Sequence, residues 1–362
     1  MPRMTTHDAF RSGVDAPVLV TGATGFVGSA LVQALCARGA SVRALVRDPV
    51  RARTQLAAPA RADGSHSLTF VHGDLTRPES LAAAVDGVAT IFHVGGHVGH
   101  HGAAEAYTRV NVEGTAALLT AAAQAGVRRF VHTSTPSVIA DGTDHFGVDE
   151  SHPVPARHRS PYPASKAAAE QLVLGAHGPR LKVVVLRPHL IWGPGASQWV
   201  RGFIDRAERG AGVRIGDGAN RIGMTYLDDC VAAHLVAADA LAADPEVGGT
   251  AYFIHSGEPV RLWDWVANLC RACGLAAPSR HVPRGIARLI GSGCDLALRT
   301  GAVGRALPVS RYLIDELTTE HYSDITRART RLGYSPTVSI ADGISRVAAW
   351  YRATRGALAP RA

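Results

Sequence analysis

Val18-Leu-Val-Thr-Gly-Ala-Thr-Gly-Phe-Val-Gly28 is the stretch that decides the fold of this chain. Its first three residues are apolar and predict a short buried strand, and residues 29–38 show the periodicity of a helix. Between these two elements stand Gly22, Gly25 and Gly28. Glycine permits a tight turn, close approach of a ligand to the backbone, and close packing of helix on strand. The free N–H groups at the helix start then favour a pyrophosphate.

The spacing of these glycines leaves one alternative open. It is Gly-x-x-Gly-x-x-Gly, whereas the commoner dinucleotide fingerprint is Gly-x-Gly-x-x-Gly. A turn with a purely structural role would need the same glycines. The strand before the turn and the helix after it favour the dinucleotide site.

Composition narrows the class of protein. The chain has 362 residues, 46% of them hydrophobic, which suits one or two domains around a large core. The formal net charge is +8, but the 38 Lys and Arg residues are dispersed, so we expect no nucleic-acid partner. This modest positive charge is more consistent with a site that binds anionic ligands.

The cysteines and the terminal residues indicate a cytoplasmic protein. Five scattered cysteines, an odd number, predict free thiols in a reducing compartment. The pair Cys270 and Cys273 has no second pair nearby, so we expect no zinc site there. Residues 1–15 lack the apolar segment of a signal peptide, and we expect a mobile leader. No uncharged run is long enough to span a bilayer.

Strand and helix signals alternate through the first half of the chain. Further strands are predicted over residues 40–46, 68–71, 90–94, 129–134 and 181–186. Helices are predicted within 50–66, where a loop follows, and over 78–85, 107–125 and 163–174. This alternation predicts an α/β fold with a doubly wound parallel sheet. Ligands of such sheets bind at the carboxyl ends of the strands, where we expect Gly22–Gly28, Gly73–Asp74, Gly95–Gly96 and Thr133–Thr135.

The second half of the chain follows a looser pattern. Helices are predicted near residues 199–210, 229–241, 261–273, 284–299 and 338–354, and a strand over 250–255 that could rejoin the sheet. We expect a dinucleotide-binding domain over residues 16–190, to which residues 226–256 return. Residues 191–225 and 257–353 would form a smaller, interleaved C-terminal domain that binds substrate.

Tyr162-Pro-Ala-Ser-Lys166 is the candidate for the chemistry. Residues four apart share one helix face, so the phenol and the ammonium can meet the same ligand. A nearby ammonium and an oxidised nicotinamide would lower the pKa of Tyr162, which makes the phenol an acid or base near neutrality. The pair taken alone could also be a surface lysine beside a half-buried tyrosine.

Taken together, these motifs resemble the extended short-chain dehydrogenase/reductase superfamily. The resemblance rests on Thr21-Gly-x-x-Gly-Phe-Val-Gly28, Asp74-Leu75, Thr133-Ser-Thr135 and Tyr162-x-x-x-Lys166, in that order, and covers about residues 16–353. Leu186-Arg-Pro-His-Leu-Ile-Trp-Gly-Pro-Gly195 is similar to one branch. That branch holds 3β-hydroxysteroid and sterol-4α-carboxylate dehydrogenases and 2-alkyl-3-oxoalkanoate reductases. It implies a Rossmann-type sheet and a nicotinamide cofactor, and it is compatible with a homodimer.

The resemblance implies roles for individual residues. Tyr162 would be the acid/base, Lys166 would hold the nicotinamide ribose, and Thr135 would be the catalytic hydroxyl, with Ser134 as the alternative. Asn111 would serve in proton relay or in backbone support. The implied cofactor-binding residues are Gly22, Thr24, Gly25, Phe26, Val27, Gly28, Arg47, Asp74, Leu75, Gly95, Tyr162, Lys166, Pro188 and His189, and His93 and Gly96 would line the same site.

Cofactor choice is predicted from the end of the second strand. Relatives that prefer NAD carry an acidic residue directly there, which bonds the ribose 2′-OH. Here Arg47 comes first and Asp48 second. A guanidinium suits a 2′-phosphate, so we expect NADP(H), with NAD(H) as the alternative.

The substrate is predicted to be bulky and apolar, of the 3β-hydroxysteroid or long-chain β-hydroxy or β-keto acid type. Trp192, Trp199, Phe203 and Met224 are expected near the active-site mouth, with residues 286–298 as a lid. Arg201 or Arg221 could orient a substrate carboxylate.

Two alternatives remain at this point. One is a nucleotide-sugar epimerase or dehydratase of the same fold, although Ile222 occupies the place of the arginine that such enzymes often carry. The other is a catalytically silent dinucleotide-binding protein. No metal is expected, because His97, His100 and His101 have no acidic partners nearby and hydride transfer needs none.

Overall fold

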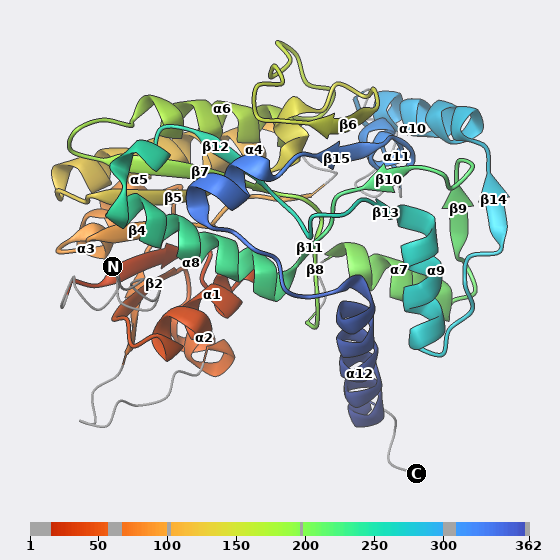
Figure 1. The fold of residues 1–362 in the computed structure, drawn as a ribbon, viewed down its shortest axis with the longest axis horizontal. Coiled ribbons are helices and arrows are strands. Elements are labelled where there is room, and N and C mark those ends of the chain that lie inside the picture. The colour runs from red at the N-terminus through yellow and green to blue at the C-terminus, as the bar shows by residue number, and fades with distance from the viewer. Residues whose placement is uncertain (1–15, 57–66, 100–102, 196–197, 300–308, 359–362) are drawn as a thin grey trace.

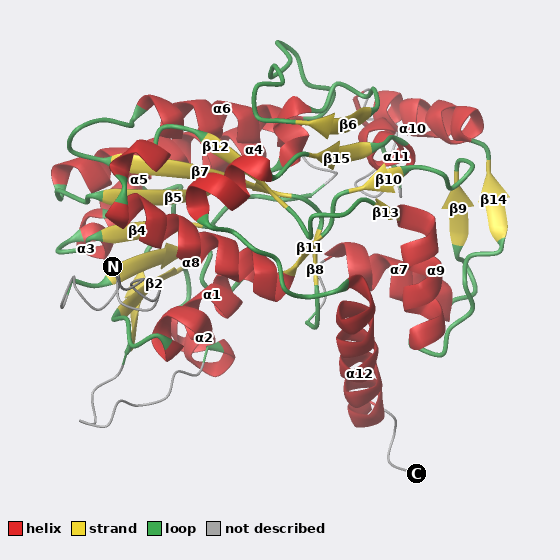
Figure 2. Cartoon of the chain, in the orientation of Figure 1, coloured by secondary structure: helices red, strands yellow, loops and turns green. Residues whose placement is uncertain are grey.

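The computed structural model describes residues 16–56, 67–99, 103–195, 198–299 and 309–358. Its centre is a seven-stranded sheet in the order β12-β7-β5-β4-β1-β2-β3, in which every pair of neighbours is parallel (Figures 1 and 2). The strands are β1 (Val18–Thr21), β2 (Val42–Val46), β3 (Leu68–His72), β4 (Thr90–His93), β5 (Arg129–Thr133), β7 (Lys182–Pro188) and β12 (Ala251–Ile254). The predicted Rossmann-type sheet is confirmed, and the strand predicted over residues 250–255 does rejoin it.

Helices cover both faces of this sheet because successive strand residues point to opposite sides. Val18 and Val20 of β1 pack in one cluster with α1 (Phe26–Ala37) and α8 (Leu227–Ala243). Leu19, which lies between these two valines in the sequence, packs in a second hydrophobic cluster with α5 (Gly114–Gln124) and α6 (Pro161–Gly175). The remaining short helices of this part are α2 (Pro49–Gln55), η1 (Pro78–Ser80), α3 (Ala82–Val85), α4 (Ala104–Tyr107), η3 (Pro136–Ile139), η4 (Pro245–Val247) and η5 (Ala328–Leu332).

The strand order reverses at β1, between β2 on one side and β4 on the other. At such a switch point the loops that leave neighbouring strands diverge, and a ligand can enter between them. Gly22 has a φ of +66°, and a Cβ there would lie 2.7 Å from the Cα of Gly95. The loops after β1 and β4 therefore touch at a point where only glycine fits.

The second half of the chain builds a separate cluster of helices beside the sheet (Figure 1). Its helices are α7 (Gln198–Glu208), α9 (Leu262–Ala272), α10 (Arg284–Arg299), α11 (Arg311–Thr318) and α12 (Ile340–Leu358). Trp192, Trp265 and Met224 are among the side chains at the centre of its core. The division into domains at residues 190, 225 and 256 stays a prediction.

Short strands tie this region to the first half of the chain. A four-stranded sheet has the order β13-β10-β15-β6, and two pairs join β11 to β8 and β14 to β9. These strands are β6 (His145–Val148), β8 (Ile191–Trp192), β9 (Val213–Ile215), β10 (Arg221–Ile222), β11 (Thr225–Tyr226), β13 (Val260–Arg261), β14 (Arg280–Val282) and β15 (His321–Ser323). Through β6, a segment of the first half pairs with a strand near the C-terminus.

Two predicted helices differ from the structure. The helix predicted over residues 107–125 begins at Ala104 and is interrupted by a π-helix, η2 (Thr108–Glu113), before α5. The helix predicted after residue 50 ends at Gln55, and residues 57–66 lie outside the described part, as do the expected leader at 1–15, His100 and His101. Every helix in the described ranges is too short or too polar to cross a membrane.

Candidate active site

Tyr162 and Lys166 lie one turn apart at the start of α6, next to the carboxyl end of β5. Pro161 begins this helix, where its missing N–H costs nothing. Lys166 is buried, and its Nζ donates to the carbonyl of Thr133 at 2.7 Å and lies 3.4 Å from Nε2 of His132. Burial lowers the pKa of Lys166 to about 8, against a small opposing effect of Glu170.

The hydroxyl of Thr135 acts on the phenol of Tyr162 and, taken alone, would lower its pKa. Burial nevertheless raises the pKa of Tyr162 to about 12. Burial outweighs the opposing contribution of Thr135, and the lowering expected from Lys166 together with an oxidised nicotinamide stays a prediction. In this structure the phenol is therefore a proton donor at neutral pH.

The two candidate hydroxyls have different partners. Ser134 donates to the carboxylate of Glu170, which forms a buried ion pair with Arg187. Thr135 caps η3, accepting from the backbone N–H of Ser137 at 3.2 Å, and its hydroxyl donates to Oγ of Ser137, also at 3.2 Å. Of the two, Thr135 is the one that faces the phenol. The Ser134 side chain is committed to the ion pair beneath it.

Asn111 sits in the π-helix η2 and bonds in two directions. Its Oδ1 accepts from the N–H of His97 at 2.6 Å, and its Nδ2 donates to the His97 carbonyl at 3.0 Å. Nδ2 also donates to Oγ of Ser165 on α6 at 2.9 Å. These contacts support the backbone role, since they hold the loop after β4 against the helix that carries Tyr162.

A buried hydrogen-bond network underlies the glycine loop. Thr21 accepts from the N–H of Gly95 at 3.0 Å and bonds Nδ1 of His93 at 2.8 Å. The other ring nitrogen of His93 bonds Thr115 at 2.9 Å. Burial, with a smaller effect of Lys166, lowers the pKa of His93 to about 3, so the ring is neutral. His93 thus lies beneath the site and holds Gly95 in place.

The start of α1 is built to receive an anion. Its N-cap is Gly25, no side chain caps it, and its first turn carries no acidic residue. Gly28 packs so closely on the turn that a Cβ there would lie 2.1 Å from the Gly22 carbonyl oxygen. A hollow of about 720 Å³ opens beside this turn, lined by Thr24, Gly25, Phe26, Ser29, Ala30, Gln33, Gln55, Pro194, Gly195, Arg201 and Leu227. These residues fit the pyrophosphate of a dinucleotide.

Arg201 on α7 was not among the cofactor residues expected from sequence. Only the fold brings this exposed guanidinium to the glycine turn, since 173 residues of chain separate Gly28 and Arg201. Val27 packs against Leu227 and Cys230 instead of lining the hollow. Leu75 packs against Gly114, and a Cβ added to Gly114 would lie only 2.9 Å from the Cβ of Leu75.

The ends of β2 and β3 lie next to each other. Arg47 is exposed, and Asp48 is the N-cap of α2, where its Oδ1 accepts from the N–H groups of Val50 and Arg51, each at 3.0 Å. Burial raises the pKa of Asp74, but hydrogen bonds from Thr76 and the charges of Arg47 and Arg77 outweigh it, so the pKa is lowered. The pairing of β2 with β3 brings these two strand ends together, so that the charge of Arg47 acts on Asp74.

Pro188 and His189 end β7, and the His189 side chain is buried. Its Nε2 bonds Oγ of Ser323 on β15 at 2.9 Å. Burial, with His255 and His321 adding to it, lowers the pKa of His189 well below its usual value. His189 therefore joins the sheet to β15 with a neutral ring. Among the described residues no group of His, Cys, Asp and Glu is arranged to hold a metal ion.

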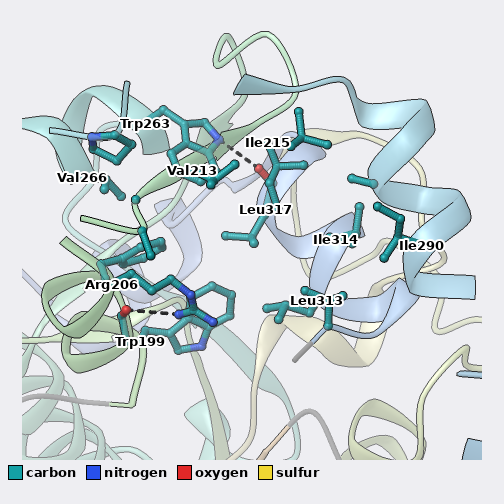
Figure 3. Close-up of a pocket in the computed structure, with 18 residues that line it drawn as sticks. Trp199, Arg206, Val213, Ile215, Trp263, Val266, Ile290, Leu313, Ile314 and Leu317 are labelled. Atoms are coloured by element: carbon teal, nitrogen blue, oxygen red, sulfur yellow. Dashed lines mark hydrogen bonds between the residues drawn. The ribbon is translucent and has the colours of Figure 1, made fainter. Parts of the chain in front are cut away.

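An apolar cavity of about 410 Å³ lies between α7, α9, α10 and α11 (Figure 3). Trp199 and Phe203 line it, together with Trp263, Ile290 and Leu317, and their place at the active-site mouth stays a prediction. Trp192 and Met224 do not: both are fully buried in the core, so their expected place at the mouth is wrong. Arg221 is also engaged, with Glu320 at 2.9 Å and over the ring of Phe146.

Comparison with known proteins places this geometry in a family. The model of the 3-beta hydroxysteroid dehydrogenase/isomerase family matches residues 19–284. The chain is 36% identical over 335 residues to a 2-alkyl-3-oxoalkanoate reductase of Stenotrophomonas maltophilia, covering 92% of this chain and 98% of that one. It is 32% identical over 345 residues to a 3 beta-hydroxysteroid dehydrogenase/Delta 5-->4-isomerase of Mycobacterium tuberculosis, covering 92% and 90%.

Solved structures agree with the fold. The structure of MoeE5 in complex with UDP-glucose and NAD superposes with a TM-score of 0.70 at 27% identity, covering 94% of this chain and 99% of that one. A nicotinamide dinucleotide fits the glycine turn, the uncapped start of α1 and the Tyr162–Lys166 pair described above. The chain belongs to the 3-beta hydroxysteroid dehydrogenase/isomerase family, and it is an NAD(P)-dependent oxidoreductase of the extended short-chain dehydrogenase/reductase type.

Proposed function

We propose that the protein interconverts a secondary alcohol and a ketone on a bulky apolar substrate, with NADP(H) as the cofactor. The substrate would be a 3β-hydroxysteroid or a long-chain β-hydroxy or β-keto acid. The observation that carries the proposal is the placement of Tyr162 one helical turn from the buried ammonium of Lys166, which bonds the Thr133 carbonyl at the strand end that leads to Thr135.

The residues of the site have distinct tasks in ketone reduction. Bound NADPH supplies the hydride. Tyr162, protonated because its pKa is about 12, gives its proton to the carbonyl oxygen, and Thr135 donates a second hydrogen bond to that oxygen. Lys166 holds the nicotinamide ribose through an ammonium that the Thr133 carbonyl orients. In alcohol oxidation the proton travels the other way, to the Tyr162 phenolate.

The end of β2 supports NADP(H). Asp48, which could bond a ribose 2′-OH, already accepts two backbone N–H groups of α2. Arg47 is exposed and close enough to Asp74 to lower the pKa of that carboxyl. A guanidinium so placed would pair with a 2′-phosphate.

The apolar cavity supports the substrate class. It is lined by aromatic and aliphatic side chains from four helices, which suits a steroid or an alkyl chain better than a sugar. The names of the two relatives point to the same classes. Arg201 is the remaining candidate to orient a substrate carboxylate, since Arg221 is paired with Glu320. None of the five cysteines, all of which lie in the described ranges, forms a disulfide, which supports a reducing compartment such as the cytoplasm.

A nucleotide-sugar enzyme is the second candidate, favoured by the likeness to a structure that holds UDP-glucose and NAD. Against it, Ile222 is buried where such enzymes often carry an arginine, and Arg221 is engaged elsewhere. A catalytically silent protein is disfavoured because Thr135, Tyr162 and Lys166 lie together at one strand end.

Steady-state assays with both cofactors test the proposal. A 2-alkyl-3-ketoacid, a 3β-hydroxysteroid and a UDP-hexose are the three substrates. We expect turnover of the ketoacid or the steroid, and none of the UDP-hexose. The Tyr162→Phe variant should lose nearly all turnover and keep its cofactor affinity, because it lacks only the proton donor. Turnover confined to the UDP-hexose contradicts the proposed substrate class.

A further inference from the structure

Helix α11 (Arg311–Thr318) has two faces with different surroundings. Three of its side chains line the apolar cavity: Leu313, Ile314 and Leu317. The hydroxyl of Tyr312, on another face, instead donates to Oγ of Ser137 at 3.0 Å. Ser137 lies 175 residues earlier in the chain, in the short helix η3 that follows Thr135. The proposed acid/base chemistry uses neither Tyr312 nor Ser137.

Ser137 and Thr135 hold each other through two hydrogen bonds. Oγ1 of Thr135 accepts from the backbone N–H of Ser137 and donates to Oγ of Ser137, each at 3.2 Å. Thr135, Ser137 and Tyr312 are each at most 8% exposed, so bulk water competes little for their hydroxyls. The hydroxyl of Thr135 is therefore held by Ser137, and the hydroxyl of Ser137 is held by a helix from the far half of the chain.

These bonds set the direction in which Thr135 can donate. A threonine hydroxyl has one proton and two acceptor lone pairs. Because the N–H of Ser137 occupies one lone pair, the proton of Thr135 is directed away from that N–H, and in the structure it goes to Oγ of Ser137. This O–H···O bond of 3.2 Å is longer than the usual range of about 2.5–3.0 Å, so it is weak and can be exchanged for a bond to a substrate oxygen.

Tyr312 keeps Ser137 in place during this exchange. Oγ of Ser137 accepts from both Thr135 and Tyr312. When Thr135 turns its proton to the substrate, the bond from Tyr312 remains, so the buried Oγ of Ser137 is not left without a donor. The N–H of Ser137 then stays on Thr135 and keeps the Thr135 hydroxyl oriented.

The neighbouring hydroxyl of Ser134 is held in a different way. It donates to the carboxylate of Glu170 at 2.5 Å, which is a short, charge-assisted bond. Exchanging that bond for one to a neutral carbonyl oxygen would be unfavourable. The long bond from Thr135 to a neutral hydroxyl is the arrangement that suits a donor which changes partners.

We propose that Ser137 and Tyr312 position the hydroxyl of Thr135 for donation to the substrate oxygen, and that Tyr312 acts through Ser137. The inference rests on the proposed function, in which Thr135 is the second donor to the carbonyl oxygen. Ser137 and Tyr312 are positioning residues in this scheme, because they act on that oxygen only through Thr135. Helix α11, which supplies part of the cavity wall, thereby also supports the catalytic hydroxyl.

Tyr312→Phe and Ser137→Ala test the positioning of Thr135. The substrate is whichever of the ketoacid and the steroid the wild type turns over. Each variant should lower kcat by about three- to tenfold, the scale of one neutral hydrogen bond, and leave KM and the affinity for NADPH unchanged. Tyr252→Phe is the matched control. It removes another buried phenol hydroxyl, which donates to the Val247 carbonyl at 2.7 Å on the edge strand β12, and it should leave kcat unchanged.

A double-mutant cycle separates a positioning role from a merely structural one. Thr135→Ala should itself lower kcat by about ten- to a thousandfold, because it removes a donor to the substrate oxygen. It leaves no hydroxyl to position, so adding Tyr312→Phe or Ser137→Ala to it should lower kcat by less than about twofold. A bond that only fastens α11 to η3 would matter equally with and without the hydroxyl of Thr135.

The outcomes distinguish this proposal from the proposed function. Wild-type turnover with an unchanged kcat in folded Tyr312→Phe and Ser137→Ala overturns the positioning role and leaves the proposed function standing. Losses that multiply with that of Thr135→Ala also overturn it. A wild type that turns over no ketone or alcohol overturns the proposed function and the positioning role with it. If Tyr312→Phe does not fold, Ser137→Ala decides the matter, because it removes one small hydroxyl and leaves the sequence of α11 unchanged.

Discussion

Asp48 follows the strand end at which cofactors of this kind are distinguished, and its carboxylate caps a helix. Two backbone N–H groups of α2 occupy Oδ1, while the exposed guanidinium of Arg47 has Asp74 as its charged neighbour. Removing the Arg47 side chain should therefore weaken the binding of NADPH, which carries the 2′-phosphate, and leave the binding of NADH nearly unchanged.

We expect Arg47→Ala to weaken NADPH binding by about ten- to a hundredfold, the scale of one charge-assisted hydrogen bond, and NADH binding by less than about twofold. Fluorescence titration of each cofactor measures both values. Arg53→Ala is the control, because Arg53 lies on the last turn of α2 over the ring of Phe70. Equal losses for NADPH and NADH would show that Arg47 does not read the 2′-phosphate.

Lys166 gives cofactor binding a dependence on pH. Its pKa of about 8 lies below its ordinary value of 10.5 because the ammonium is buried. The unfolded chain therefore binds more protons than the folded one between these values, so this group makes stability rise with pH across that window. Cofactor binding should show the opposite trend, because the ribose is held by the charged form.

Cofactor affinity should thus fall by about tenfold between pH 7 and pH 9 in the wild type. Titrations of NADPH across this range measure it. The Lys166→Met variant should bind more weakly and show no such fall, while Lys182→Met on β7 should behave as the wild type. A fall of the same size in Lys166→Met would assign the titration to another group.

At the scale of elements, the π-helix η2 joins the loop after β4 to the helix that carries Tyr162. Single π-turns inside helices are often found at functional sites. Here the wide turn carries Asn111, whose side chain is 2% exposed and bonds both His97 and Ser165. Losing the Asn111 side chain would remove its bonds to the His97 N–H, the His97 carbonyl and Ser165 together.

We expect Asn111→Ala to lower the free energy of unfolding by about 2–4 kcal/mol, since several buried hydrogen bonds are lost together. Urea denaturation followed by circular dichroism measures this change. Asn268→Ala provides the comparison: its side chain bonds Arg271 on the exposed face of α9, and its loss should cost less than about 0.5 kcal/mol. Similar costs for the two variants would mean that η2 does not depend on Asn111.

The parallel sheet could be predicted from sequence because its strands are short apolar runs and its turns carry glycine. The interruption of the helix at η2 could not, since residues 107–125 keep one helical pattern throughout and the π-turn depends on contacts with His97 and Ser165. Strand β6 was missed for a similar reason: its partner β15 is more than 170 residues away, so pairing and not local pattern makes it a strand.

The candidate site also contains both residues that the sequence could predict and residues that it could not. Tyr162, Lys166 and Thr135 belong to motifs that are local in sequence. Tyr312 belongs to a helix with no motif, and only the packing of α11 on η3 brings its phenol to Ser137. Trp192 and Met224 could not be told from pocket residues by sequence, because apolar side chains in a core and in a cleft look alike.

On the scale of the whole molecule, α11 lies between the catalytic hydroxyls and the apolar cavity. One of its faces bonds Ser137, while another contributes Leu313, Ile314 and Leu317 to the cavity wall. A substrate with an alkyl or steroid body in the cavity would thus contact the helix that also bonds Ser137, two residues after Thr135. Ile290 of α10 lies beside Ile314 in the cavity wall (Figure 3).

Ile290 and Leu289 allow the role of this cavity to be tested with a matched pair. Both are exposed on α10, by 51% and 75%, but only Ile290 is in the lining of the cavity. Ile290→Trp should fill part of the cavity and raise KM for a long-chain 2-alkyl-3-ketoacid by about tenfold, or 1.4 kcal/mol, without changing KM for a short-chain 3-ketoacid. Leu289→Trp should change neither value, since its indole would lie in solvent. If both variants raised KM for the long-chain substrate alike, or neither did, the alkyl chain would bind outside the cavity, and the 410 Å³ between the four helices would have no part in choosing the substrate.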